Sequence, residues 1–132
     1  MKRINIQLFP LGMLVLSCGL AACTGPRTAA ELPPTPAAQQ ALEMVQANYQ
    51  AGRYGEVIRY VAKSDDLATA PASVKIPALK LQAFSYCVSN YPQLCQDAFA
   101  RILAIDPNFE LTPAEIGHPV WGPAYKRAKQ AR

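Results

Sequence analysis

Apolar residues recur every three or four positions through most of the chain from residue 37 onward, and this spacing most constrains the fold. In the first stretch they include Ala38, Ala41, Val45 and Tyr49, which share one face of a helix with about 3.6 residues per turn. No stretch alternates polar and apolar residues over about four to eight positions, as a half-buried strand does. The spacing therefore predicts an all-α fold.

Turn-forming residues divide this part of the chain into four main helices. They are expected from Ala37 to Gly52, from Tyr54 to a turn at 64–66, over 73–89 and over 93–105. Pro77 falls in the opening turns of the third helix, so its regular part is expected to begin there. Short turns between the helices predict two antiparallel hairpins followed by a C-terminal helix.

The C-terminal segment carries its own helix signals. Thr112, Pro113 and Glu115 have the spacing of a capping box, which is expected to start only a short turn because Gly117 and Pro119 follow. A last helix is then expected from about residue 119 to 131. Its apolar stripe would cover the open end of the second hairpin. The stripe comprises Val120, Ala124 and Ala128, with Trp121 and Tyr125 beside it.

The first 22 residues have the order of a secretory signal, with two basic residues, an apolar run and small residues at the end. The segment Leu20-Ala21-Ala22-Cys23 resembles the lipobox of bacterial lipoproteins. This resemblance implies cleavage before Cys23 and attachment of a diacylglycerol with palmitate-type acyl chains to its thiol. A transmembrane anchor is the alternative, but Gln7 and Pro10 interrupt the apolar run, which is shorter than the roughly 18 residues of a span.

The chain thus divides into a signal peptide (1–22), a Pro-rich tether (23–36) and one helical domain (37–132). Thr24 follows the acceptor cysteine, whereas in the enteric sorting rule Asp there retains a lipoprotein in the inner membrane. The sequence therefore resembles a lipoprotein of the outer membrane of a Gram-negative bacterium. Such a protein faces the periplasm and is held to the membrane by its lipid.

Two cysteines remain in the exported domain, Cys87 and Cys95. Each lies four residues from Tyr91, the midpoint of the turn between the third and fourth helices. Positions equidistant from such a turn face each other, and an oxidising compartment favours a disulfide, so this pair is expected to be bonded. Two buried free thiols are the alternative. A structural zinc site is not expected from two cysteines and one distant histidine.

The segment Tyr49–Ile58 resembles the middle of a tetratricopeptide repeat, with an aromatic residue closing one helix and Gly52-x-Tyr54 in the turn. Val57 departs from the usual Ala. The segment Ala104–Asn108, which contains Asp-Pro, resembles the end of such a repeat. Aligning the two hairpins gives a period of 38 residues, against about 34 in that family. The resemblance implies two degenerate repeats.

The segment Phe109–Pro123 contains Gly-His-Pro-x-Trp-Gly-Pro and resembles the end of small tetratricopeptide-like lipoproteins associated with type VI secretion, the TssQ type. The resemblance implies an accessory role in assembling a contractile secretion machine, through protein partners of the cell envelope. A general outer-membrane scaffold or pilotin-like lipoprotein is the alternative. The candidate partner-binding residues are Tyr54, His118, Trp121 and Tyr125. One interpretation makes Trp121 and Tyr125 an exposed anchor for a partner. The alternative makes Trp121 a core or capping aromatic residue.

No set of residues predicts catalysis. His118 is the only histidine of the chain, and no nucleophile pattern, phosphate-binding loop or paired-carboxylate motif accompanies it. An envelope hydrolase is therefore disfavoured, and neither a small-molecule substrate nor a cofactor other than the lipid is expected. Basic residues are scattered except near the C-terminus, so nucleic acid is not an expected partner. The prediction is a binding or assembly protein.

Overall fold

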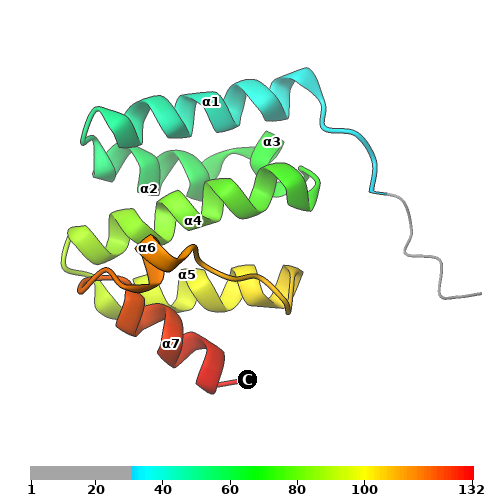
Figure 1. Cartoon of the computed structure of the whole chain (residues 1–132). Coiled ribbons are helices and arrows are strands. Elements are labelled where there is room, and N and C mark those ends of the chain that lie inside the picture. Colours follow the sequence, from blue (N-terminus) through cyan, green and yellow to red (C-terminus); the bar gives the residue numbers. More distant parts are fainter. Residues whose placement is uncertain (1–30) are drawn as a thin grey trace, which may run out of the picture. The chain divides into compact units, whose positions relative to one another are not determined.

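The computed structural model describes residues 31–132, which form seven helices and contain no strand (Figure 1). The prediction of an all-α fold is confirmed. The helices are α1 (Pro36–Gln50), α2 (Tyr54–Lys63), α3 (Asp65–Ala68), α4 (Ala72–Val88), α5 (Pro92–Ile105), α6 (Pro113–Ile116) and α7 (Gly122–Gln130).

Two antiparallel hairpins make up most of the fold. They are α1–α2 and α4–α5, and α4 lies centrally because it packs against α1, α2 and α5 (Figure 1). The C-terminal helix α7 packs against α5, on the outer side of the second hairpin. Two hairpins followed by a C-terminal helix were expected from the sequence, but the last helix lies along α5 and not across the open end of the second hairpin.

The turns of the two hairpins are built alike. The residue after each helix cap adopts a left-handed conformation, Gly52 at φ 71° and Asn90 at φ 62°. In each turn its N–H donates to the carbonyl three residues back, and the next N–H donates to the carbonyl five residues back. This pair of bonds is the Schellman motif. The two turns lie 38 residues apart, as the period predicts, while membership of the tetratricopeptide family stays a prediction.

The hydrophobic core has two parts. One part joins α1, α2, α3 and the start of α4 and includes Val45 and Val57. The other joins the end of α4 with α5 and α7 and includes Phe99 and Tyr125. Half-buried side chains contact both parts: Tyr49, Val61 and Leu81. Four apolar residues that share one face of α5 are all buried: Ala98, Phe99, Ile102 and Leu103.

A buried polar residue ties the hairpins together. Gln82 of α4 is fully buried. Its amide nitrogen donates to the carbonyl of Ile58 on α2 at 3.0 Å, and its amide oxygen accepts from Arg101 on α5 at 2.6 Å. Buried polar groups stabilise a fold only when they are paired, and this pairing fixes three helices relative to one another.

The short helix α3 was not predicted, because residues 64–66 were expected only to close the second helix. Ser64 does both: its N–H ends α2 by donating to the carbonyl of Tyr60, and its Oγ accepts from the N–H of Leu67 to begin α3. Leu67 is 2 % exposed and belongs to the first part of the core. Its burial holds the extra turn in place.

The prediction that the regular part of the third helix begins at Pro77 was wrong. Helix α4 begins at Ala72 and continues through Pro77. Proline has no N–H and leaves the carbonyl of Ser73 without its helical partner, but Ser73 is exposed, so water can hydrogen-bond to that carbonyl. Burial of Val74 and Ala78 in the first part of the core holds the opening turn helical.

The last helix begins at Gly122 rather than near residue 119. Ala124 and Ala128 are buried as predicted, but Val120 lies before the helix and is 44 % exposed. Val88 is also exposed, because it lies where α4 ends. Both exposed valines lie at the same end of the domain, since Cys87 contacts the backbone of Val120.

Candidate protein-binding site

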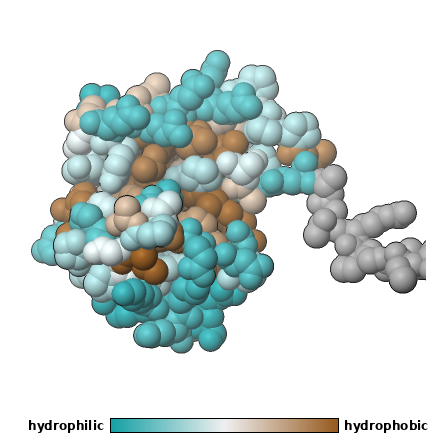
Figure 2. Space-filling model, viewed as in Figure 1, coloured by the Kyte–Doolittle hydropathy of each residue, from teal (hydrophilic) through white to brown (hydrophobic). Residues whose placement is uncertain are grey.

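A groove runs between α1 and α4. It encloses about 360 Å³, and its walls come from side chains spaced three and four residues apart on each helix. Figure 2 shows hydrophobic surface in the band between α1 and α4, bordered by hydrophilic rows. The lining residues are Gln46, Tyr49 and Gln50 of α1 and Pro77, Lys80 and Leu81 of α4.

A continuous chain of aromatic rings starts at this groove. Tyr49 contacts Tyr54 edge to face, with centroids 5.5 Å apart, and Phe84 at 6.4 Å. Phe84 stacks on Trp121 at 4.3 Å, and Trp121 stacks on His118 at 3.4 Å with the rings nearly parallel. Offset and edge-to-face contacts of this kind stabilise aromatic clusters. The chain joins the first hairpin turn, α4 and the C-terminal segment.

The loop that carries His118 and Trp121 is held by local backbone geometry. The capping box at Thr112 and Glu115 forms as predicted and starts α6. Gly122 then crosses close to α6, where a Cβ atom would lie 2.3 Å from the carbonyl oxygen of Ile116. The N–H of Val120 donates to Nδ1 of His118 at 3.2 Å. These contacts position the Trp121 ring against Phe84 of α4 and the His118 ring against Trp121.

One ion pair lies between the groove and this loop. Lys80 of α4 donates to Glu115 at 2.7 Å, and its ammonium lies 5.8 Å from the centre of the Phe84 ring. Burial raises the pKa of Glu115, but hydrogen bonds from Lys80 and the Thr112 backbone outweigh it and lower the pKa below its usual range. Burial, with the nearby Tyr54 and Glu115, raises the pKa of Tyr49. Tyr49 therefore stays a neutral hydroxyl.

Three of the four candidate partner-binding residues come together here. Tyr54, His118 and Trp121 are partly exposed members of the aromatic chain. The indole N–H of Trp121 is buried and has no hydrogen-bond partner within residues 31–132. One face of the Trp121 ring packs on Phe84 at the edge of the core, which agrees with the expected core role. The His118 ring covers the other face.

Tyr125 was wrongly expected at an exposed anchor. It is fully buried, and its ring packs edge to face on Phe99 and Phe109. Its hydroxyl lies 2.7 Å from the carbonyl oxygen of Phe109 and 2.9 Å from Oε2 of Glu110. Burial and the neighbouring Glu110 carboxylate raise its pKa. Tyr125 is thus a core residue that fixes α7.

None of the groove residues was predicted as a site residue from the sequence, nor were Phe84 and Glu115 beside the groove. Tyr49 was recognised only as the aromatic residue that closes the first helix, and Glu115 only as a helix cap. No local pattern places Lys80 opposite Glu115, which is 35 residues away. The spacing of residues 77, 80 and 81 on one helix face was the available signal.

The expected disulfide is present in the structure. Cys87 and Cys95 are bonded, with Cα atoms 5.2 Å apart, and the bond joins the end of α4 to the start of α5. The Sγ atom of Cys87 lies 3.6 Å from the carbonyl oxygen of Val120. A disulfide sulfur carries no hydrogen to donate, so this is a packing contact. It brings the C-terminal loop against the turn of the second hairpin.

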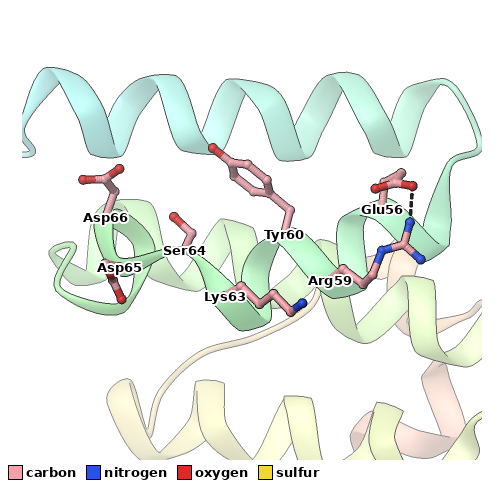
Figure 3. A pocket seen from close by; sticks show the side chains of 7 residues that line it. All are labelled: Glu56, Arg59, Tyr60, Lys63, Ser64, Asp65 and Asp66. Carbon is pink, nitrogen blue, oxygen red and sulfur yellow. Dashed lines mark hydrogen bonds and ion pairs between the residues drawn. The ribbon is translucent and has the colours of Figure 1, made fainter.

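A second pocket lies on α2 and α3 (Figure 3). It encloses about 450 Å³, and its walls are polar except for the Tyr60 ring. Glu56 and Arg59 form an ion pair there, Lys63 projects beside them, and the Ser64 hydroxyl already accepts a helix-capping hydrogen bond. The remaining lining residues are Asp65 and Asp66. Side chains of both charge signs line this pocket, and none of the candidate partner-binding residues contributes to its walls.

Two searches of the described residues, for metal sites and for membrane spans, found neither. Within residues 31–132, no group of three or more His, Cys, Asp or Glu side chains is placed to hold a metal ion. No helix in that range has the length and apolarity needed to cross a bilayer. The proposed signal peptide (1–22), the lipid acceptor Cys23 and most of the tether lie outside the described residues.

Comparison with protein-family models, curated proteins and solved structures finds no match to this chain.

Proposed function

We propose that the protein is a lipid-anchored, non-catalytic adaptor of the Gram-negative cell envelope that binds a polypeptide segment of a protein partner. The observation that carries this proposal is the union of the α1–α4 groove with the aromatic chain that reaches Trp121 and His118. Aromatic side chains that are partly exposed beside a groove are typical of binding surfaces.

The groove suits an uncharged stretch of polypeptide. Gln46 and Gln50 are exposed and offer amide donors and acceptors, which match the backbone of an extended segment. Pro77 and Leu81 supply apolar contact on the opposite wall. Lys80 is already paired with Glu115, so it offers little attraction to an acidic partner. Recognition would therefore depend on shape and hydrogen bonds more than on charge.

The resemblance to type VI secretion lipoproteins supports one class of partner. The segment that carries it, 109–123, supplies His118 and Trp121 to the aromatic chain. We propose that the partner belongs to a contractile secretion machine. A pilotin-like role, in which an outer-membrane protein occupies the groove, is the second candidate and rests on the same surface and the same lipid anchor.

Copurification from cross-linked cells tests the binding surface. The variant Gln46→Arg/Gln50→Arg fills the groove without touching the core, and it is expected to lose partners that the wild-type chain recovers. The matched control is Gln40→Arg/Met44→Arg, which adds the same charge on an exposed part of α1 outside the groove. Equal recovery by both variants would contradict the groove. Secretion-machine components favour the first role, and outer-membrane assembly factors alone favour the second.

Two further experiments test the anchor and the absence of catalysis. Cys23→Ser is expected to release the protein from membranes or to leave the precursor uncut, and normal membrane fractionation of this variant would contradict lipidation. Purified protein is expected to leave cell wall intact. Hydrolysis that disappears in His118→Ala would instead identify an envelope enzyme.

A further inference from the structure

We infer that the Cys87–Cys95 disulfide positions Trp121, so that the aromatic site is complete only while this bond is intact. Reduction of the bond releases the C-terminal loop from α4 while both hairpins stay folded. The consequence for partner binding rests on the proposed function, in which Trp121 belongs to the binding surface.

Two neighbouring residues of the C-terminal loop contact one face of α4. Phe84 and Cys87 lie three positions apart, so they share a face of the helix. Phe84 stacks on Trp121 with ring centroids 4.3 Å apart, and Sγ of Cys87 lies 3.6 Å from the carbonyl oxygen of Val120. The last turn of α4 therefore sets where the indole ring lies, and the disulfide is the covalent restraint on that turn.

The turn that follows α4 has little else to hold it closed. Asn90 occupies the left-handed position, at φ 62°, that Gly52 occupies in the first hairpin. Asparagine adopts this conformation at a higher cost than glycine, which has no Cβ atom. Burial adds little here, because six of the seven residues 88–94 are exposed. Opening the disulfide therefore lets this turn relax and lets the end of α4 fray with it.

The indole ring of Trp121 is held by stacking. Phe84 covers one of its faces and His118 the other. Its N–H is buried and has no hydrogen-bond partner among residues 31–132. A buried donor without a partner costs free energy, and contact with water recovers it. Movement of the ring out of the stack is therefore favoured once the disulfide no longer fixes the helix end beneath it.

A dithiol reductant breaks the bond in two exchange steps. Cys87 is 8 % exposed and Cys95 0 % exposed, so the first thiolate of the reductant attacks Sγ of Cys87, and Cys95 leaves as a thiolate. The second thiolate of the reductant then attacks the reductant sulfur of this mixed disulfide and releases Cys87. Two electrons and, through water, two protons pass from the dithiol to the cysteines, and the reductant becomes a disulfide.

Fluorescence of Trp121, the only tryptophan of the chain, measures its position directly. Residues 23–132 with Cys23→Ser are compared in the oxidised state and after reduction with dithiothreitol. The acrylamide quenching constant is expected to double or more on reduction, and the emission maximum to move to longer wavelength, while circular dichroism retains most of its helical signal. The variant Cys87→Ala/Cys95→Ala is expected to match the reduced chain and to be unaffected by dithiothreitol.

The variant Asn90→Gly supplies a rescue. In the reduced chain it is expected to return the quenching constant toward the oxidised value, because glycine closes the second turn as Gly52 closes the first. The matched control is Asn108→Gly, which replaces an exposed asparagine outside the left-handed region and is expected to leave the reduced chain unchanged. An equal effect of the two substitutions would contradict the role given to the turn.

Other outcomes overturn the inference. Equal quenching of the oxidised and reduced chains would show that the bond does not position Trp121. A loss of helical signal in parallel with the rise in quenching would show that the bond holds the whole domain rather than the loop.

Copurification of the wild-type chain and of Cys87→Ala/Cys95→Ala separates the positioning role from the proposed function. Partners recovered by the wild-type chain and lost by the variant support both. Equal recovery by the two chains would refute the dependence of binding on the bond. Recovery by neither chain would refute the proposed function, while the fluorescence comparison still decides whether the disulfide positions Trp121.

Discussion

Replacing Cys87 and Cys95 together by alanine is expected to lower the free energy of unfolding by about 2.5 kcal/mol. The bond closes a loop between residues eight positions apart. In the chain-entropy treatment, opening a loop of that length returns about 8 cal/mol/K of entropy to the unfolded chain, which gives this value near 25 °C. For a domain of this size, 1 kcal/mol corresponds to roughly 4–8 °C in Tm, so Tm should fall by about 10–20 °C.

The surroundings of the bond add a smaller term. Cys95 is fully buried and Cys87 nearly so, and both belong to the second part of the core. Truncation to alanine removes the packing of two sulfur atoms, which is expected to add less than about 1 kcal/mol. Reducing the wild-type chain opens the same loop but keeps both sulfurs. Comparison of the two therefore separates the loop contribution from the packing contribution.

Urea unfolding followed by circular dichroism gives both free energies. Residues 23–132 are expressed without the signal peptide and with Cys23→Ser, so that Cys87 and Cys95 are the only cysteines present. The oxidised chain should unfold at the highest urea concentration, and the reduced chain and the double-alanine variant should unfold at lower and similar concentrations. A midpoint that reductant leaves unchanged, or two labelled thiols after denaturing alkylation of the oxidised chain, would refute the reasoning.

Three other substitutions follow from the structure. Gly122→Ala places a Cβ atom 2.3 Å from a backbone oxygen of α6 and should cost about 1–3 kcal/mol in thermal unfolding. The control Gly55→Ala meets nothing closer than 4.0 Å and should not destabilise the domain. Equal Tm values for the two variants would contradict the close crossing of Gly122 and α6. Tyr125→Phe leaves the Phe109 carbonyl without its hydroxyl donor and should cost about 1–2 kcal/mol; an unchanged urea midpoint would exclude that bond as a stabilising contact. Hydrogen bonds to Glu115 lower its pKa despite burial, so the stability that the Glu115 carboxylate contributes is present above the ordinary carboxyl range and lost as pH falls through the lowered pKa. Glu115→Gln should cost up to about 1 kcal/mol of unfolding free energy at pH 7 and should flatten the fall of Tm at acid pH. An unchanged fall of Tm at acid pH would contradict this.

The sequence was sufficient for features that depend on local chemistry. Gly52 ends the first helix in the left-handed conformation as predicted, and Thr112 with Glu115 forms the predicted capping box. The disulfide followed from the symmetry of Cys87 and Cys95 about one turn. Each of these features involves residues fewer than ten positions apart, where backbone preferences and side-chain reach decide the geometry.

Features that depend on packing between distant segments were not predictable in the same way. Pro77 was expected to begin the regular helix, but burial of Val74 holds the turn before it helical. Tyr125 was a candidate for an exposed anchor together with Trp121, yet it fills the space beside Phe99. The stack of Trp121 on Phe84 brings together residues from separate parts of the chain. Such contacts exist only once the helices have packed.

The burial of Tyr125 also determines when the domain can finish folding. Its ring fills the second part of the core, and it lies on α7, which follows both hairpins along the chain. In any process that delivers the chain from its N-terminus, whether synthesis or threading through a membrane channel, both hairpins emerge while Phe99 still lacks the Tyr125 ring. The second hairpin can acquire its native packing only after α7 has emerged.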